Sequence, residues 1–130
     1  MPVTLSILDE TTAGTRRHAG TLTCESVPST LRDIIRLRVQ QEVERLNRSD
    51  TRIFQGLVQP EQSERMLNGE RPTHPILDWE QQYARAIKAF RGNGFLVLVD
   101  DRQITDLDEA LDLRPQTQVT FLRLVALIGG

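Results

Sequence analysis

The C-terminal segment is the part of the sequence that most constrains the fold. From Val119 to Leu127 the chain is largely apolar, with the alternation and β-branched content of a strand. Ile128 follows, and then Gly129 and Gly130. Because glycine is entropically costly inside a strand, two in succession predict that the strand ends before them. We therefore expect a rigid final strand that leads into a flexible tail over residues 128–130.

The segments before this strand predict more sheet. Phe95 to Val99 is an unbroken apolar run whose length and valine content favour a buried strand. A turn at Asp100-Asp101 separates it from a short returning strand, Arg102 to Ile104. Asp106 to Leu113 is a leucine-bearing connector, and the polar turn Arg114 to Gln118 leads into the final strand.

The N-terminal part predicts a hairpin and a helix. Val3 to Leu8 alternates as a strand does, and His18 to Glu25 is a weaker strand candidate, so the two suggest an opening hairpin. Thr30 and Asp33 have the spacing of a capping box. A helix should run from there to about Leu46, with an apolar ladder of Leu31, Ile35, Val39 and Val43.

The middle of the chain is less regular. Residues 51–77 are interrupted by prolines and Gly69 and predict loops, without a firm assignment. A second helix is clearer, because Asp78 can cap it and aromatic or aliphatic residues repeat at helical spacing. Gly92-Asn93-Gly94 should end it. The predicted core stripe of this helix is Trp79, Tyr83, Ile87 and Phe90.

The resulting order is strand, strand, helix, irregular segment, helix, strand, short strand, connector, strand. This order predicts an α+β fold in which helix packs on one face of a mixed sheet. A chain of 130 residues fits one domain, residues 1–130.

This order, with a last strand that runs into Gly-Gly, resembles the ubiquitin-like β-grasp superfamily. That superfamily includes ubiquitin and the bacterial sulfur carriers of thiamine and molybdopterin synthesis. The resemblance covers residues 95–130 together with the hairpin and helix over 3–46. It implies a ubiquitin-like β-grasp fold with an inserted helical segment.

Two features depart from the family pattern. Residues 47–94 form an insertion with its own helix, which is compatible with a lid, a dimer surface or a platform for a partner. The tail Ala126-Leu127-Ile128 is apolar, as in the sulfur carriers, whereas the tail of ubiquitin carries arginines. The insertion favours a specialised protein modifier and the tail favours a sulfur carrier, so both alternatives stay open.

The resemblance implies a chemistry for the C-terminus. An E1-like adenylating enzyme would activate the Gly130 carboxylate with ATP and Mg, which belong to that partner and not to this chain. The activated carboxylate would then form a thioester, a thiocarboxylate or an amide with a target, with an E2-like protein as a further partner. Gly129, Ile128 and Leu127 would thread through an apolar channel of the activating enzyme. The chain itself would hold no catalytic residue and no cofactor.

Composition narrows the classes of partner. The net charge is −2, and a general nucleic-acid binder would show a basic excess. No apolar run is long enough to span a membrane, and no secretory signal pattern is evident. Cys24 is the only cysteine, which fits a reducing cytoplasm best. We therefore expect a cytoplasmic protein with no nucleic-acid or membrane partner.

Several other residues are of types that can be modified, bind metals or act as nucleophiles. Lys88 is the only lysine, against fifteen arginines, and is the candidate for self-conjugation. His18 and His74 lack the spacing of metal ligands, and Cys24 lacks a second cysteine or base, so we expect no metal site. The acidic stretch from Asp100 to Glu109 reads as a solvated surface. Alternatives to activation at Gly130 are a non-conjugated β-grasp interaction module or a small subunit that binds a partner protein.

Overall fold

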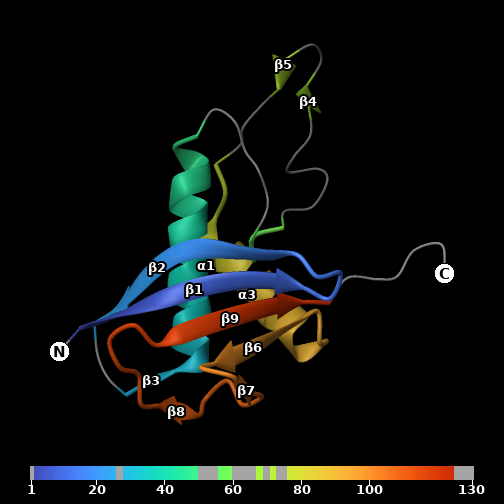
Figure 1. Cartoon of the computed structure of the whole chain (residues 1–130). Helices are drawn as coiled ribbons and strands as arrows, with labels where there is room; N and C mark the ends of the chain where they lie inside the picture. Colours follow the sequence, from blue (N-terminus) through green and yellow to red (C-terminus); the bar gives the residue numbers. More distant parts are fainter. Residues whose placement is uncertain are drawn as a thin grey trace.

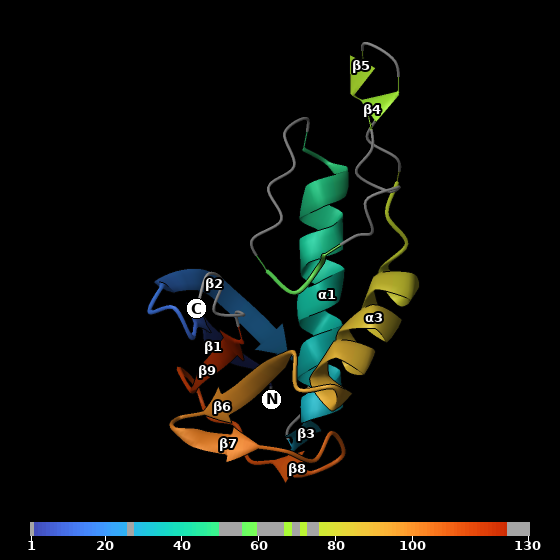
Figure 2. The ribbon, with the colours of Figure 1, turned by 90° about the vertical axis from the view of Figure 1, so that its right-hand side faces the viewer.

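The computed structural model describes residues 2–25, 28–49, 56–59, 67–68, 71–72 and 76–124. These residues form a mixed five-stranded sheet with two helices, α1 (Leu31–Asn47) and α3 (Trp79–Arg91), packed on one of its faces (Figures 1 and 2). Among the residues that the structure describes, no helix lies on the opposite face of the sheet (Figure 2). The predicted α+β class, with helix on one face of a mixed sheet, is confirmed.

The sheet has the order β2-β1-β9-β6-β7. The central strand β9 pairs in parallel with β1 and antiparallel with β6, while the β1–β2 and β6–β7 pairs are antiparallel hairpins. The first and last strands of the chain therefore lie side by side at the centre of the sheet. The strand bounds are Val3–Thr11 for β1, Arg16–Cys24 for β2, Phe95–Val99 for β6, Arg102–Ile104 for β7 and Gln118–Arg123 for β9.

Helix α1 begins as the capping box predicts. The Thr30 hydroxyl accepts a hydrogen bond from the Asp33 amide, and the Asp33 carboxylate accepts one from the Thr30 amide. The helix ends at Asn47, whose side-chain amide exchanges two hydrogen bonds with the backbone of Leu77 at 2.9 and 3.1 Å. This exchange fixes the chain just before α3 against the end of α1.

Helix α3 buries the predicted stripe and adds to it. Asp78 caps the helix as expected, and Ile87 and Phe90 are buried. Trp79 and Tyr83 are half-buried and pack against the core. Gln82 and Ala86, which the stripe did not include, are buried as well.

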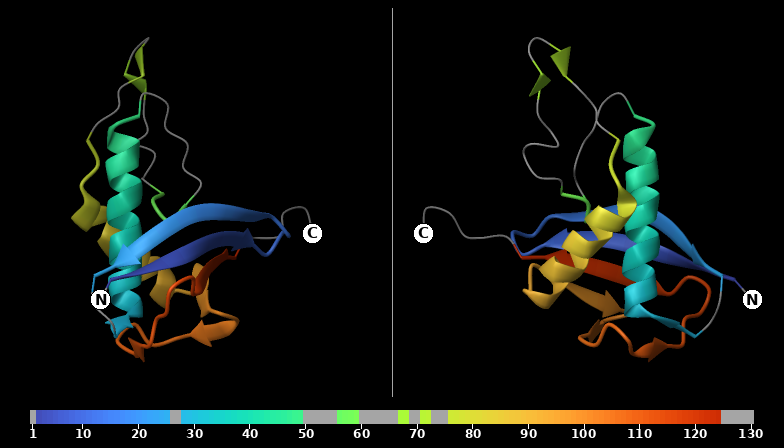
Figure 3. Two further views of the ribbon diagram at one scale, coloured as in Figure 1. Left: turned by 60° about the vertical axis from the view of Figure 1, so that its left-hand side comes forward. Right: turned by 180° about the vertical axis from the view of Figure 1, so that it is seen from behind.

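A chain of aromatic contacts ties α3 to the sheet. The ring centroids of Phe90 and Phe95 lie 5.7 Å apart, and those of Phe95 and Phe121 lie 6.2 Å apart. One hydrophobic cluster contains side chains from both helices and from all five strands of the sheet. The helix of the predicted insertion is therefore part of the common core. Figure 3 shows α3 crossing α1 on the same side of the sheet.

The strands differ from the expectations in three places. In the predicted connector, β8 (Ala110–Leu111) pairs with β3 (Ser29–Thr30) just before α1. Within the unassigned middle of the chain, β4 (Leu67–Asn68) pairs with β5 (Arg71–Pro72). Strand β9 ends at Arg123 rather than continuing to Leu127, and Leu124 follows it as a non-strand residue that is 41% exposed. Residues 125–130 lie outside the described residues.

Candidate functional site

The end of β9 is held from both sides. The Thr12 amide, in the β1–β2 turn, donates to the Arg123 carbonyl at 3.1 Å, and the Leu124 amide donates to the Gly94 carbonyl at 3.1 Å. Arg123 and Leu124 are thus anchored between the β1–β2 turn and the loop that joins α3 to β6. We call this anchored pair the tail root, because the predicted site residues follow it in the sequence.

The predicted site residues fall into two groups. Gly130, Gly129, Ile128 and Leu127 lie outside the described residues, so their roles stay predictions. Lys88 is exposed in the last turn of α3, and its role as an acceptor stays a prediction.

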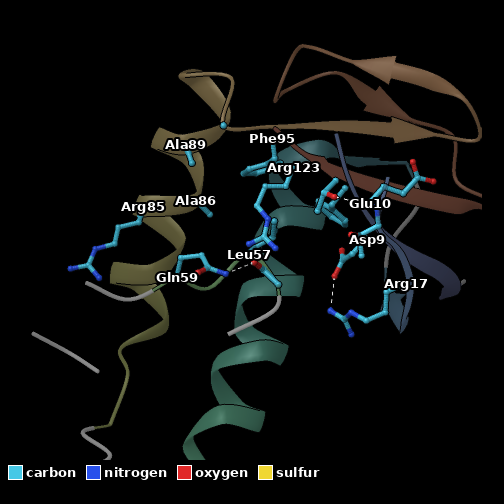
Figure 4. A pocket seen from close by; sticks show the side chains of 15 residues that line it. Asp9, Glu10, Arg17, Leu57, Gln59, Arg85, Ala86, Ala89, Phe95 and Arg123 are labelled. Atoms are coloured by element: carbon cyan, nitrogen blue, oxygen red, sulfur yellow. Dashed lines mark hydrogen bonds and ion pairs between the residues drawn. The ribbon is translucent and has the colours of Figure 1, made fainter. Parts of the chain in front are cut away.

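A cavity of about 420 Å³ opens beside the tail root. It lies between the sheet, α3 and the short segment 56–59 (Figure 4). Its lining residues are Asp9, Glu10, Thr11, Thr15, Arg17, Gly56, Leu57, Gln59, Arg85, Ala86, Ala89, Gly94, Phe95, Phe121 and Arg123. The cavity has no signature in the sequence, because its walls come from four separate stretches of the chain.

A charged network lies behind one wall of the cavity. Both terminal nitrogens of Arg38 donate hydrogen bonds to the Asp9 carboxylate, and the bond from Nη2 has a length of 2.6 Å. Arg17 donates to the same carboxylate at a distance of 3.0 Å. Arg38 Nε donates to Glu42 at 2.9 Å. The Arg38 and Glu42 side chains are each only 5% exposed. Asp9, although it lines the cavity, is therefore already neutralised by two arginines.

The Arg38 guanidinium is held in its charged form. Burial by itself would lower its pKa, but hydrogen bonds and charges from Asp9 and Glu42 outweigh that effect and raise the pKa above the usual arginine value. The guanidinium also lies 4.6 Å from the centroid of the Phe121 ring, in a cation–π arrangement. Arg38 is thus a fixed structural cation between α1 and the sheet.

Glu42 also fixes the cavity wall formed by residues 56–59. Its carboxylate accepts hydrogen bonds from the Leu57 amide at 2.9 Å and the Val58 amide at 3.3 Å. A Cβ atom on Gly56 would lie 2.1 Å from Glu42 Oε1, so only glycine fits at this close approach. The segment is therefore positioned by a buried carboxylate rather than left as a free loop.

Arg123 supplies a cation inside the cavity. Its side chain runs from the end of β9 toward Leu57 (Figure 4) and is half-buried. Among the described residues, no carboxylate forms an ion pair with its guanidinium. By contrast, Glu10 pairs with Arg16 at 3.2 Å and Asp9 is bound by Arg17 and Arg38. Within the described ranges, the positive charge of Arg123 in the cavity is therefore not matched by an ion-paired carboxylate.

The uncovered face of the sheet is partly apolar. The register places Leu96 opposite Leu122, and Leu98 opposite Thr120, which in turn lies beside Leu8 on β1. Side chains alternate along a strand, so these positions point away from the two helices. Three leucines on this face are half-buried: Leu96 and Leu98 on β6, and Leu122 on β9.

The remaining candidates have structural partners. His18 is exposed and lies 3.1 Å from the Ser6 hydroxyl on the neighbouring strand. Cys24 is buried, and burial raises the pKa of its thiol, which keeps it protonated. His74 lies outside the described residues. Within the described ranges, no cluster of three or more His, Cys, Asp or Glu side chains has the geometry of a metal site.

The acidic stretch is tied into the structure by individual bonds. Asp108 accepts two hydrogen bonds from Arg32, at 2.9 and 3.2 Å, and Glu109 accepts one from Arg102 at 2.7 Å. Asp100 accepts from the Gln118 amide at 2.9 Å. These carboxylates bind turns to neighbouring elements, and one of their partners is Arg32 in the first turn of α1.

Comparison with protein-family models, with curated proteins and with solved structures finds no match for this chain. In the part of the chain that the structure describes, neither helix is long and apolar enough to cross a membrane.

Proposed function

We propose that this chain is a ubiquitin-like β-grasp protein that acts through the carboxylate of Gly130. The observation that carries the proposal is the tail root. Arg123, the last residue of the central strand, and Leu124 after it are bonded to backbone on both sides, so the strand ends at a fixed point. A tail that starts from a rigid point can be delivered reproducibly into the active site of another protein.

The strand order supports the same proposal. A mixed sheet with the parallel pair β1 and β9 at its centre and helix on one face is compatible with a β-grasp-like fold. The second helix, α3, is then an addition that packs beside α1 in the common core.

The proposed chemistry takes place on a partner. A free carboxylate is a poor electrophile at neutral pH, so an E1-like enzyme joins Gly130 to AMP from ATP with release of pyrophosphate. A thiolate, a sulfide donor or an amine then attacks the carbonyl carbon, and AMP leaves. Gly129 and Gly130 suit a narrow channel because they lack side chains. The proposal requires a free carboxylate at Gly130, whether it is made so or exposed by trimming.

The uncovered sheet face offers a docking surface for that partner. Leu96, Leu98 and Leu122 lie on the strands around β9, so a partner that covers them also reaches the tail root. A half-buried apolar surface of this kind suits transient protein contact.

A second candidate function is a binding module that is not conjugated. The cavity beside the tail root favours it, because tail chemistry on a partner does not require a ligand-sized cavity in this chain.

The test of the first proposal is intact-mass analysis of the protein recovered from its native host. We expect either replacement of one oxygen by sulfur at Gly130 or a branched linkage from Gly130 to an amine of another protein. The matched control is a chain that lacks Gly129 and Gly130, which should show neither product. If the wild-type and shortened chains give the same masses and the same partner set, activation at Gly130 is wrong.

A lysine variant separates two routes to self-linked chains. Lys88→Arg removes the only side-chain amine of the protein. If isopeptide-linked chains persist in this variant, Lys88 is not the acceptor, and the N-terminal amine remains as the route.

A further inference from the structure

The cavity beside the tail root has the properties of a ligand site, and this inference does not depend on activation at Gly130. We propose that the cavity binds a small amphipathic monocarboxylate, with the carboxylate on Arg123 and the apolar body against α3 and the sheet. The volume of about 420 Å³ lies within the roughly 300–1,000 Å³ range of small-molecule pockets.

The apolar half of the site is formed by side chains from three directions. The apolar lining consists of Phe95 and Phe121 from the sheet, Ala86 and Ala89 from α3, and Leu57 from the segment 56–59. Small alanines on α3 leave the space that a ligand chain would occupy, whereas larger side chains there would close it. An alkyl or aryl body would bury its surface on these walls.

The polar half of the site selects an anion. Asp9 is neutralised by Arg17 and Arg38, and Glu10 is paired with Arg16. Arg123 is therefore the side chain whose charge a ligand would balance, and its guanidinium can hold a carboxylate through two parallel hydrogen bonds. A single guanidinium that holds one carboxylate in this way suits a monocarboxylate ligand.

The site is organised before any ligand binds. The Glu42 carboxylate positions Leu57 and Val58 by accepting hydrogen bonds from their backbone amides. The tail root is held by its backbone hydrogen bonds to Thr12 and Gly94. A site with fixed walls loses little entropy on binding a small molecule. The cavity is enclosed by α3, the sheet and the segment 56–59. It therefore suits a compact ligand better than an extended peptide.

Octanoate is a suitable probe because it joins one carboxylate to an unbranched apolar chain. We expect titration of the full-length protein with octanoate to shift the backbone amide signals of Leu57, Ala89 and Gly94 in two-dimensional NMR spectra. Octanol, which has the same chain length and no charge, should bind about tenfold more weakly or worse, because it lacks the charge-assisted hydrogen bonds.

Variants identify the group responsible. Arg123→Gln should weaken octanoate binding by about ten- to a hundredfold, and Arg123→Lys should retain part of it. Ala89→Trp, at an exposed helix position, should block the cavity without loss of the fold. Arg114→Gln is the matched control, since Arg114 is an exposed arginine distant from the cavity lining.

The outcomes decide the proposal in either direction. Selective shifts at the cavity that depend on Arg123 and disappear in Ala89→Trp would support it. Equal binding of octanol and octanoate, unchanged binding in Arg123→Gln, or shifts confined to the uncovered sheet face would overturn it. If an acidic apolar peptide shifts these amides and octanoate does not, the site takes a protein ligand and the small-molecule proposal is wrong.

Discussion

At the scale of single residues, Glu42 has the most consequences. One carboxylate accepts from the Arg38 guanidinium and from two backbone amides, and so joins α1 to the segment that closes the cavity. Sequence reasoning did not single out Arg38 or Glu42, because charged helix residues usually face solvent. A signal was present: both fall on the apolar face of α1, four residues apart and with opposite charges.

The close approach at Gly56 gives a prediction. Gly56→Ala would place a methyl group 2.1 Å from Glu42 Oε1, so the carboxylate or the segment must move. We expect a loss of roughly 1–3 kcal/mol in the free energy of unfolding, measured by urea denaturation. The matched control is Gly92→Ala, where the nearest atom lies at 3.4 Å and the backbone conformation is ordinary. An equal effect of the two substitutions would contradict this interpretation of Gly56.

The Asp33 carboxylate makes stability depend on pH. Although partial burial opposes ionisation, hydrogen bonds from Thr30 and Ser29 and the charge of Arg36 hold the pKa of Asp33 below its usual value of 3.8. A group with a depressed folded-state pKa contributes stability that is present above the unfolded value and lost as the pH falls through the folded value. We therefore expect Asp33→Ala to be less stable than wild type at neutral pH, and the difference to shrink below pH 3.8. Urea denaturation across acidic pH checks this, and a constant difference would contradict it.

At the scale of elements, prediction from sequence succeeded where local chemistry fixes the ends of an element. Strands β6 and β7 have the predicted bounds because residues in the left-handed region frame them: Asn93 at φ 60° before β6, and Asp100 and Asp101 at φ 52° and 85° between the two strands. The β3–β8 pair was missed because two-residue strands have no periodicity and their pairing joins distant parts of the chain.

The start of α1 offers an element-scale prediction. Thr30→Ala removes the hydroxyl that accepts from the Asp33 amide and should cost about 1 kcal/mol of unfolding free energy. Thr30→Ser keeps the hydroxyl and should lie close to wild type. Chemical denaturation of both variants distinguishes loss of the cap from loss of the methyl group, because equal destabilisation would point to packing alone.

At the scale of the whole molecule, the helix of the insertion belongs to the core. Sequence reasoning identified α3 but could not place it, since its contacts with α1 and β6 depend on how distant segments pack. The cavity could not be predicted for the same reason. Arg123 lines it only because the segment 56–59, distant in the sequence, forms the facing wall. The predicted Gly130 site stays a prediction at this scale, although the strand that leads to it is now placed.

The aromatic chain gives a whole-molecule prediction. Phe90 is buried and contacts Phe95, which contacts Phe121 at the centre of the sheet. Phe90→Ala should cost about 3–5 kcal/mol of unfolding free energy, measured by thermal or urea denaturation. Arg91→Ala, at the exposed neighbouring position, should change it by about 0.5 kcal/mol or less. A small effect of Phe90→Ala would mean that α3 is a peripheral attachment.

The parallel pairing of β1 with β9 has a consequence for synthesis on the ribosome. Ser6 pairs with Gln118, and Val97 pairs with Phe121, so the inner edges of β1 and β6 cannot be paired with β9 until residues 118–123 have been made. Closing such long-range pairs is slow, and open strand edges invite association with other chains. The sheet is therefore completed only when β9 pairs with β1 and β6. The hydrogen bonds of the tail root form in the same step.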